Sequence, residues 1–276
     1  MTNPDIDVSV AIPVKNEEAN LAKCLERLGR FKEIIIIDSG SEDKTQDIGR
    51  KFGARIVNFN WDGKYPKKRN WFLMNEPPTQ PWVLFLDADE FINDDFCDAV
   101  VTAIKDDKLN GFWLNYDNYF QGGQLKHGVT QTKLALFRVG TGLYEKIEES
   151  FWSTFDMEIH EHPIIQGNIG KIHTPIEHKD YKGLSTFIRK HNEYAQWEAK
   201  RYVQLQEDDV PWQHFTKRQK FKYSHITKFW YPWFYFLFTY VVKVGFLDGS
   251  TGFHYAAYKA WYFQTIRLLI REQNET

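Results

Sequence analysis

Four consecutive isoleucines at positions 34 to 37 constrain the fold of this chain more than any other feature of its sequence. Successive side chains of a strand point to opposite faces of a sheet, so a uniformly β-branched strand is buried on both faces. Such strands are typical of parallel sheets, whose connecting helices cover both sides. The run therefore predicts a central strand of a parallel sheet flanked by helices.

Strand and helix patterns alternate over the first 140 residues, which favours right-handed βαβ units. The strand-like runs are 8–12, 34–37, 55–59, 82–86, 111–116 and 134–138. Helical spacing predicts helices at 17–28 and 43–52, and Ser39 or Ser41 is expected to cap the second. We expect 111–116 and 134–138 to be antiparallel strands at one edge of the sheet.

Composition and motifs exclude several classes of protein. A formal net charge of -2 gives no reason to expect a nucleic-acid partner. Neither a Gly-x-Gly-x-x-Gly pattern nor a Walker-type loop occurs, which counts against dinucleotide and P-loop chemistry. Two cysteines, Cys24 and Cys97, fit a reducing compartment better than a disulfide framework. The first ten residues lack the basic start and apolar run of a signal peptide, so we expect a cytoplasmic protein.

Acidic side chains follow two of the predicted strands. Asp38 ends the isoleucine run, and Asp87 and Asp89 follow the apolar run 82–86. Open α/β sheets bind ligands beyond the carboxyl ends of their strands, so these acids are expected to face a ligand. Close carboxylates repel each other unless a cation lies between them, and Mg²⁺ or Mn²⁺ prefers oxygen ligands and bridges to phosphate. A solvated acidic loop that caps the next helix is the competing interpretation.

Basic and histidine-rich segments add further candidates. Residues 64–69 hold a basic group that ends in Arg69 and suits a diphosphate, although such a run is more often a solvated helix face. The histidines at 160, 162, 173 and 178 suggest a zinc site, but no cysteine lies near them and their spacing fits no standard structural motif. Ordinary polar loop histidines are the alternative.

Four segments occur in an order that resembles the family 2 glycosyltransferases of the GT-A fold. They are residues 8–18, 37–45, 69–70 and 86–90. The resemblance covers about residues 6 to 140 and implies a mixed, mainly parallel α/β sheet flanked by helices. It also implies a divalent cation, Mn²⁺ or Mg²⁺, and a UDP-sugar donor.

The same resemblance implies roles for individual residues. Asp38 would accept the imide hydrogen of uracil, although Ser39 stands where the family often has a second acid. Arg69 would approach the diphosphate and Asp87 the ribose, and Asp89 would ligate the metal. The residues that would line the nucleoside pocket are Ala11, Pro13 and Glu17.

Three later segments resemble a subgroup of that family, the lipopolysaccharide core β-1,4-glucosyltransferases. They are His160-Glu161, residues 178–181 and residues 245–249. The resemblance implies that Glu161 is the base that takes the acceptor's proton and that His178 helps to hold the metal or the diphosphate. From the residues alone, the nearby acids Asp156, Glu158 and Asp180 stay open as alternatives for the base.

The last third of the chain has a different pattern. Residues 184–203 repeat at helical spacing, residues 213–228 carry five basic residues and no acid, and 229–242 is an uncharged run rich in aromatic residues. That run is too short to span a bilayer and has the composition of an interfacial belt. We expect an anionic membrane surface as its partner; a buried helical subdomain is the alternative.

These features predict a GT-A catalytic domain over 1–182 and a helical, aromatic-rich, membrane-surface extension over 183–276. The expected enzyme transfers a hexose, glucose above all, from a UDP-sugar to a glycolipid or oligosaccharide acceptor such as lipopolysaccharide core. The transfer inverts the configuration of the sugar's anomeric carbon. It would be peripheral on the inner face of the bacterial cytoplasmic membrane. The alternatives are a metal-dependent nucleotidyltransferase and a non-catalytic membrane-binding module with a nucleotide pocket.

Overall fold

The computed structural model describes residues 5–147, 153, 155–158, 162–180, 182–207 and 215–275. The chain divides into two compact units. The sheet unit comprises residues 1–118 and 130–181, and the helical unit comprises 119–129 and 182–276. The second unit therefore begins where sequence patterns change but also takes in a segment from the middle of the chain. Whether the units are independent domains remains a prediction.

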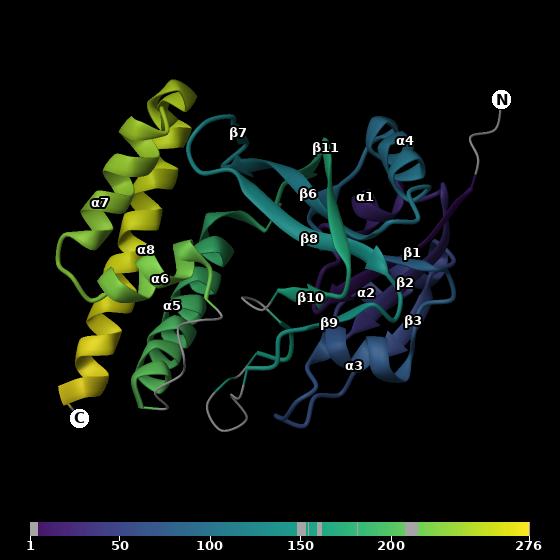
Figure 1. The fold of residues 1–276 in the computed structure, drawn as a ribbon, viewed down its shortest axis with the longest axis horizontal. Coiled ribbons are helices and arrows are strands. Elements are labelled where there is room, and N and C mark those ends of the chain that lie inside the picture. Colours follow the sequence, from purple (N-terminus) through teal and green to yellow (C-terminus); the bar gives the residue numbers. More distant parts are fainter. Residues whose placement is uncertain are drawn as a thin grey trace. The chain divides into compact units, whose positions relative to one another are not determined.

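The sheet unit alternates strands and short helices along the chain (Figure 1). Its strands are β1 Ile6–Val14, β2 Phe31–Asp38, β3 Arg55–Asn58, β4 Trp82–Phe85, β5 Glu90–Phe91, β6 Leu109–Phe120, β8 Gln131–Arg138, β9 Gly142–Tyr144, β10 Pro163–Ile165 and β11 Asn168–His178. Its helices are α1 Leu21–Leu25, α2 Thr45–Lys51, α3 Lys68–Asn75 and α4 Asp94–Ala103.

The main sheet has the order β3-β2-β1-β4-β8-β6-β11-β5. Strands β3, β2, β1 and β4 are parallel, whereas β8 is antiparallel to both β4 and β6. The expectation of an antiparallel pair was right, but its placement at an edge was wrong, because β6 and β8 lie inside the sheet. Residues 134–137 of β8 are all buried, so this strand needs cover on both faces and a neighbour on each side.

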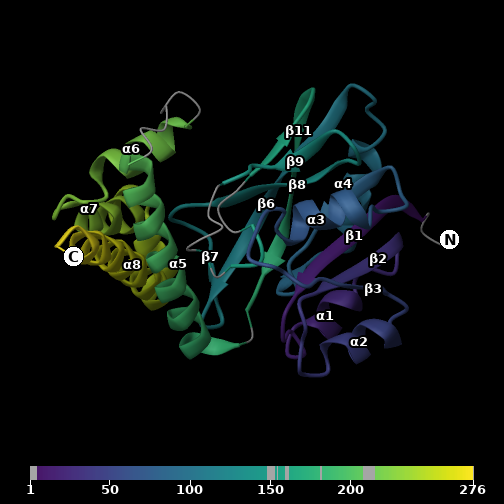
Figure 2. The same ribbon diagram turned by 90° about the horizontal axis from the view of Figure 1, so that it is seen from below.

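The isoleucine run is buried from both sides, which confirms the central parallel strand. Ile36 packs in the core that includes residues of α1 and α4. Ile35 and Ile37 pack in a second core with Phe72 of α3. The two cores hold alternate residues of the strand, as the pleat requires. Figure 2 shows the strands and their covering helices from a second direction.

The first two helices are shorter than their sequence patterns predicted, because residues before them form an ordered loop. Asn16 has a left-handed φ of 55°, and the Glu17 and Glu18 amides donate to Thr45 Oγ1 and Asp43 Oδ2. The expected serine cap on α2 was wrong, since the helix has no side-chain cap at its own N-cap position. Cys24 and Cys97 are both free and buried.

The helical unit is built from β7 Gly123–Leu125 and a series of helices. They are α5 Gly183–Glu207, α6 Lys217–His225, α7 Tyr231–Leu237, a π-helical turn Phe238–Val242, a 3-10 helix Gly245–Asp248 and α8 Gly249–Glu275. Alanines of α5 pack against Ile226, which follows α6, and against aromatic and isoleucine side chains of α7 and α8 in a core of their own. Among the described residues, none of the helices has the length and apolar character that crossing a bilayer demands.

The segment 119–129 packs within the helical unit. Phe120 lies edge-on to Phe187, Tyr255 and Tyr258, with ring centroids 5.1, 5.7 and 5.8 Å apart. The His127 amide donates to the buried Asp248 carboxylate at 2.9 Å. The Gly-Phe-Leu-Asp-Gly segment thus holds this part of the chain.

Candidate functional site

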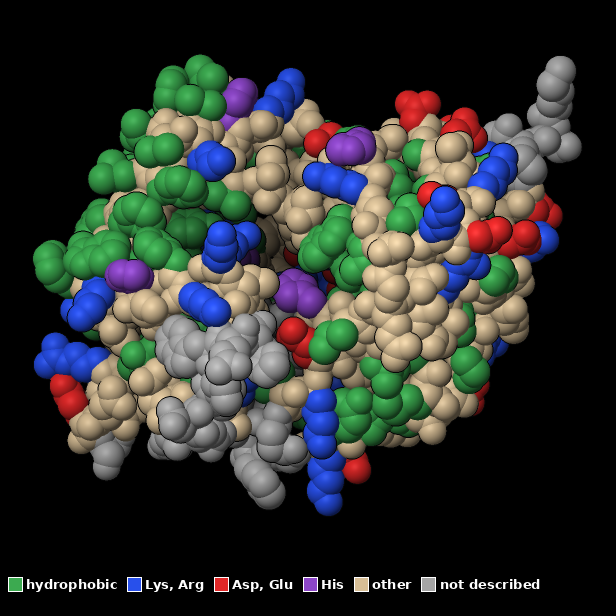
Figure 3. Space-filling view, in the orientation of Figure 1, with side chains coloured by type: hydrophobic (Ala, Val, Ile, Leu, Met, Phe, Trp, Pro, Cys, Tyr) green, Lys and Arg blue, Asp and Glu red, His purple; other side chains and the backbone are tan. Residues whose placement is uncertain are grey.

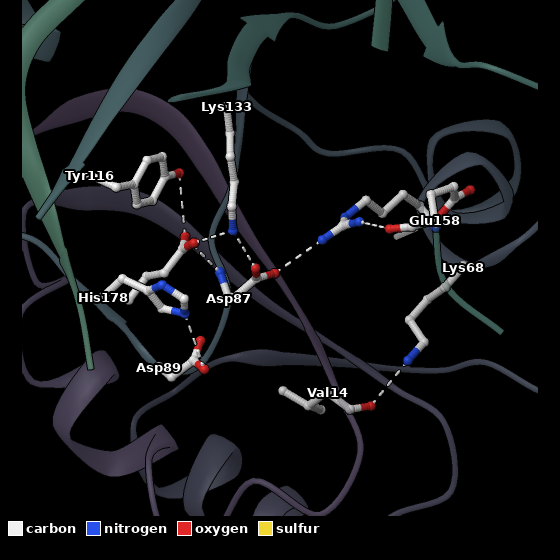
Figure 4. Close-up of polar contacts among 10 residues, drawn as sticks. Val14, Lys68, Asp87, Asp89, Tyr116, Lys133, Glu158 and His178 are labelled. Atoms are coloured by element: carbon white, nitrogen blue, oxygen red, sulfur yellow. Dashed lines mark hydrogen bonds and ion pairs between the residues drawn. The ribbon is translucent and has the colours of Figure 1, made fainter. Parts of the chain in front are cut away.

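Three carboxylates gather just beyond the carboxyl end of β4. Asp87 and Asp89 follow the strand, and Glu90 begins β5 after a turn closed by its own amide and the Asp87 carbonyl. Glu90 is 1% exposed, and its Oε2 accepts from the Asp87 amide at 3.1 Å. The sequence-predicted acids therefore lie at the sheet end where open α/β sheets bind ligands. Figure 4 shows Asp87 and Asp89 of this cluster.

Two cations from other elements neutralise Asp87 (Figure 4). Arg69, in the first turn of α3, donates from Nη2 to Asp87 Oδ1 at 3.0 Å. Lys133, on β8, donates from Nζ to Asp87 Oδ2 at 2.7 Å and also to Glu90 Oε1. The Lys133 ammonium lies 5.0 Å from the centre of the Tyr116 ring. Sequence reasoning had expected a metal ion to relieve this repulsion, but side chains of the protein already do so in part.

The electrostatic consequence differs between the two neighbouring acids. Burial alone would raise the pKa of Asp87, but Lys133 and Arg69 hold the pKa of this carboxyl well below its usual range. Burial raises the pKa of Glu90, and Lys133 offsets that rise only in part. Despite its burial, Lys133 has a pKa raised well above its ordinary value by Asp87 and Glu90. Asp87 therefore stays ionised, which is the form that hydrogen-bonds or binds cations.

Asp89 faces a histidine rather than a lysine. His178, at the end of β11, has its Nε2 3.5 Å from Asp89 Oδ2, and its Nδ1 is 3.0 Å from Asn118 Oδ1. Burial lowers the pKa of His178, but the Asp89 carboxylate raises it by more. The net result is a pKa above the usual value for histidine. A carboxylate oxygen and an imidazole nitrogen at this spacing suit a cation such as Mn²⁺ that takes its other ligands from phosphate and water.

This pair is a partial metal site rather than a complete one. Within the described part of the chain, no group of three or more His, Cys, Asp or Glu side chains is arranged to hold a metal ion. Mg²⁺ ordinarily uses one or two protein carboxylates and completes its shell with water and substrate phosphates. Asp89 and His178 fit that mode of binding.

The start of α3 is tied to residues 155–158. Glu158 is 2% exposed, and its two oxygens accept from the Arg69 and Asn70 amides at 2.9 and 3.1 Å. These amides have no partner within the helix, so a side chain distant in sequence caps it. Arg69 also donates to the Glu158 carbonyl. Arg69 therefore joins this segment to Asp87.

A buried lysine precedes Arg69. The Lys68 ammonium lies 3.1 Å from Asp156 and 3.3 Å from the Val14 carbonyl at the end of β1. Burial lowers the pKa of Lys68, and the charge of Asp156 opposes that fall. Of the basic run 64–69, Lys67, Lys68 and Arg69 are not the solvated helix face that such a run usually forms.

Asp38 is fully buried and already accepts several hydrogen bonds. They come from the Ser41 amide at 3.0 Å, the Ser41 hydroxyl, and Gln46 Nε2 at 2.7 Å. Gln46 also donates to Asn58 Oδ1 at 3.1 Å. An imide hydrogen that bonds to Asp38 would therefore share its carboxylate with Gln46 and Ser41.

The other predicted nucleoside residues lie on or just after β1. Ala11 and Pro13 are buried in the strand, where they pair with Ile35 and Ile37 of β2. Glu17 follows in the loop, and its side chain accepts from Asn20 at 3.0 Å. These three residues thus approach the same carboxyl end of the parallel strands as Asp38 does.

Some expected residues fall outside the described part of the chain. Glu161, the predicted base, is one of them, as are His160 and Tyr181. Of the alternative acids, Glu158 caps α3, Asp156 pairs with Lys68, and Asp180 lies 3.4 Å from Asn20.

Sequence reasoning missed Lys133, Glu90 and Tyr116. A lysine just before the apolar run 134–137 was the available signal for the first. A charged residue beside a buried strand needs a partner, but the sequence does not name that partner.

Comparison with known proteins identifies the class of enzyme. The model of glycosyl transferase family 2 matches residues 9–173. The lipopolysaccharide core biosynthesis glycosyltransferase LpsC of Rhizobium meliloti is 29% identical over 210 residues, which cover 73% of each chain. An uncharacterised glycosyltransferase of Rickettsia typhi is 24% identical over 206 residues, covering 71% of this chain and 68% of the relative.

Two solved structures of distant sequence are among those that match this chain. Glucosyl-3-phosphoglycerate synthase from Mycobacterium tuberculosis, in complex with Mn²⁺ and UDP, is 22% identical with a TM-score of 0.32. That match covers 42% of this chain and 44% of the synthase. S. aureus TarS, residues 1–349, is 14% identical with a TM-score of 0.47, and the match covers 98% of this chain and 92% of TarS.

Proposed function

The chain belongs to glycosyl transferase family 2, and from this premise we propose that it inverts the anomeric centre while transferring a hexose from a UDP-sugar to the saccharide of a lipid-linked glycan. Glucose is the proposed sugar, and lipopolysaccharide core is the proposed acceptor. The relative that motivates this acceptor is the lipopolysaccharide core glycosyltransferase of Rhizobium meliloti.

One observation carries the proposal: ionised Asp87 and the Asp89–His178 pair meet at the carboxyl end of β4. A UDP-sugar presents a ribose, a diphosphate and a labile glycosidic bond. Asp87 is the proposed acceptor of a ribose hydroxyl hydrogen, since a half-buried carboxylate with a low pKa remains an acceptor at neutral pH. Asp89 and His178 are the proposed ligands of Mn²⁺ or Mg²⁺. When bound, the cation neutralises charge on the departing diphosphate.

Other residues of the sheet unit complete the proposed donor site. Ala11, Pro13 and Glu17 would contact the nucleoside, and Asp38 would accept the uracil imide hydrogen. Arg69 is the proposed diphosphate ligand, and its hydrogen bonds to Asp87 and to the Glu158 carbonyl fix the guanidinium beforehand.

Glu161 is the proposed base. Inversion by direct displacement requires one group to accept the proton of the attacking hydroxyl. Replacing Glu161 by Gln should lower turnover on the order of 10²-fold or more and should leave donor binding in place.

The decisive experiment is a screen of UDP-sugars, with Mn²⁺, Mg²⁺ or EDTA, for UDP release and for a thermal shift. We expect UDP-glucose with Mn²⁺ to give both signals and Asp89→Ala to lose both. Pyrophosphate release from a nucleoside triphosphate would instead indicate a nucleotidyltransferase. Donor binding without turnover on any acceptor tested would favour the non-catalytic module.

We also propose that the helical unit holds the protein on an anionic membrane at the inner face of the cytoplasmic membrane. Four apolar side chains recur at every fourth position and form what we term the aromatic ridge: Phe229, Trp233, Leu237 and Val241, which are 72, 67, 55 and 51% exposed. Figure 3 shows hydrophobic side chains gathered over the helices of this unit.

The charge around the ridge suits anionic lipid. Residues 215–271 contain nine Lys or Arg and one acid, Asp248, whose side chain is 3% exposed. Aromatic side chains flanked by basic residues are typical of helices that lie in the interface of a membrane. An acceptor carried on a lipid would then be concentrated at the enzyme.

A further inference from the structure

Lys133 has no role in the proposed donor site, although it lies at the centre of the acidic cluster (Figure 4). It reaches the cluster from β8, 46 residues after Asp87 in the sequence. Its ammonium joins Asp87 to the buried Glu90 and also faces the Tyr116 ring. Lys133 is half-buried, and both of its ion pairs are made with acids of this cluster.

The hydrogen bonds of the cluster occupy every oxygen of its two inner carboxylates. Asp87 Oδ1 accepts from Arg69, and Asp87 Oδ2 accepts from Lys133. Glu90 Oε1 accepts from Lys133, and Glu90 Oε2 accepts from the Asp87 amide and lies 3.5 Å from the Tyr116 hydroxyl. A divalent cation that approached Asp87 Oδ2 or Glu90 Oε1 would have to displace the Lys133 ammonium.

Asp89 has a different kind of partner. His178 Nε2 lies 3.5 Å from Asp89 Oδ2, and imidazole is a common metal ligand, whereas an ammonium is not. A cation can therefore join Asp89 and His178 together. The cluster thus sets one acid beside a potential metal ligand and two acids beside an ammonium.

We propose that Lys133 is a positioning residue that withholds Asp87 and Glu90 from the metal. The cation is then limited to Asp89 and His178 and needs the diphosphate oxygens of the donor to complete its shell. This inference rests on the proposed donor site. It adds that the nucleotide-free protein binds the cation weakly because Lys133 occupies Asp87 and Glu90.

The test compares Mn²⁺ binding by calorimetry and electron paramagnetic resonance in the absence of any nucleotide. Lys133→Met releases Asp87 and Glu90 as oxygen ligands, so we expect Mn²⁺ to bind about tenfold more tightly than to the wild type, because affinity follows the number and charge of the ligands. In EDTA, the same variant should bind UDP more weakly, since Lys133 no longer holds Asp87, the proposed ribose acceptor, in place. Poor folding lowers both affinities and cannot change them in opposite directions.

Three matched variants sharpen the result. Lys133→Arg keeps the charge and should stay close to the wild type in Mn²⁺ affinity. Lys171→Met removes an exposed lysine from β11 and should change neither affinity. Adding Glu90→Gln to Lys133→Met removes one of the released carboxylates and should reverse most of the gain.

The outcomes separate the inference from the function on which it rests. If the wild type binds Mn²⁺ with UDP but Lys133→Met binds Mn²⁺ alone no more tightly than the wild type, the withholding role is wrong and the donor site stands. If the wild type binds no Mn²⁺ even with UDP, the metal site itself is wrong.

Discussion

At the scale of single residues, His191 on α5 makes the stability of the helical unit depend on pH. Its ring stacks on Phe187 with centroids 3.9 Å apart, and its Nδ1 donates to the Phe187 carbonyl at 2.9 Å. Burial and the charge of Lys259 lower the pKa of His191 to about 4. The folded protein therefore keeps this imidazole neutral at a pH where the unfolded chain protonates it.

We expect the stabilising contribution of His191 to be complete above the unfolded pKa of about 6.5 and to be lost as the pH falls toward 4. The loss should be on the order of 2 kcal/mol, a value reduced for the partial exposure of the ring. Urea unfolding of the wild type and His191→Gln at pH 7.5 and 5 tests this. An equal loss of stability in both proteins between the two pH values would contradict it.

The sequence predicted single residues well where one segment carries the information. Asp38, Asp87 and Asp89 follow strand-like runs, so their place at the ends of strands could be read directly. Lys133 could not be found in this way, because its partners Asp87 and Glu90 precede it by more than forty residues. These residues come together because β4 and β8 are neighbours in the sheet. The local sequence of neither strand predicts that pairing.

At the scale of elements, α3 depends on a side chain that is distant in the sequence. The helix has no side-chain cap of its own, and Glu158 accepts from two of its first amides instead. We expect Glu158→Ala to lower the free energy of unfolding by about 2 kcal/mol, because the variant removes a buried, charged acceptor and leaves two backbone amides without their hydrogen bonds to it. Denaturant unfolding measures this.

The control for that variant is Glu177→Ala on β11. Glu177 pairs with Lys179 at the surface, with its side chain 38% exposed, so its loss should change stability by no more than about 0.5 kcal/mol. Equal effects of the two variants would argue against the cap.

The aromatic ridge makes a prediction at the same scale. Replacing Phe229, Trp233 and Leu237 together by Ser removes exposed apolar area, so we expect the folded protein to lose at least tenfold in affinity for phosphatidylglycerol vesicles. Flotation with these vesicles and with neutral phosphatidylcholine vesicles measures it. Met74→Ser, at a residue 46% exposed on α3, is the control and should bind as the wild type does. Undiminished binding by the triple variant would remove the ridge from the proposal.

The sequence predicted where strands and helices lie along the chain better than it predicted where each one ends or which strands are neighbours in the sheet. Every strand-like run of the first 140 residues is a strand, since burial on both faces leaves a strong apolar pattern. Helix α1 begins later than its apolar spacing suggested, because the Glu17 and Glu18 amides donate to Thr45 at the start of α2 and to Asp43 just before it. The interior place of β8 depends on pairing with β4 and β6, which periodicity does not encode.

At the scale of the whole molecule, the two units are interleaved in the sequence. Residues 119–129 belong to the helical unit, and Phe120 and His127 find their partners there. A chain that ends at residue 181 keeps this segment and loses those partners. We expect it to aggregate, because the Phe120 ring would then be exposed.

A second truncated chain tests the cause. Replacing 119–129 by a short Asn-Gly turn in the chain that ends at 181 removes the unpartnered segment and lets β6 and β8 pair directly. We expect this chain to be soluble and to unfold cooperatively, as judged by circular dichroism and size exclusion. If the chain that retains 119–129 behaves equally well, the segment does not need its partners.

The interleaving also bears on how such a protein can be recombined. A single crossover near residue 182 would bring in a foreign set of helices but leave the parental Phe120 and His127 facing them. The foreign helices would then need an aromatic cluster and an acid in matching places. Exchange of the helical unit as a whole takes two coordinated exchanges of gene segments, so these two stretches should be inherited together.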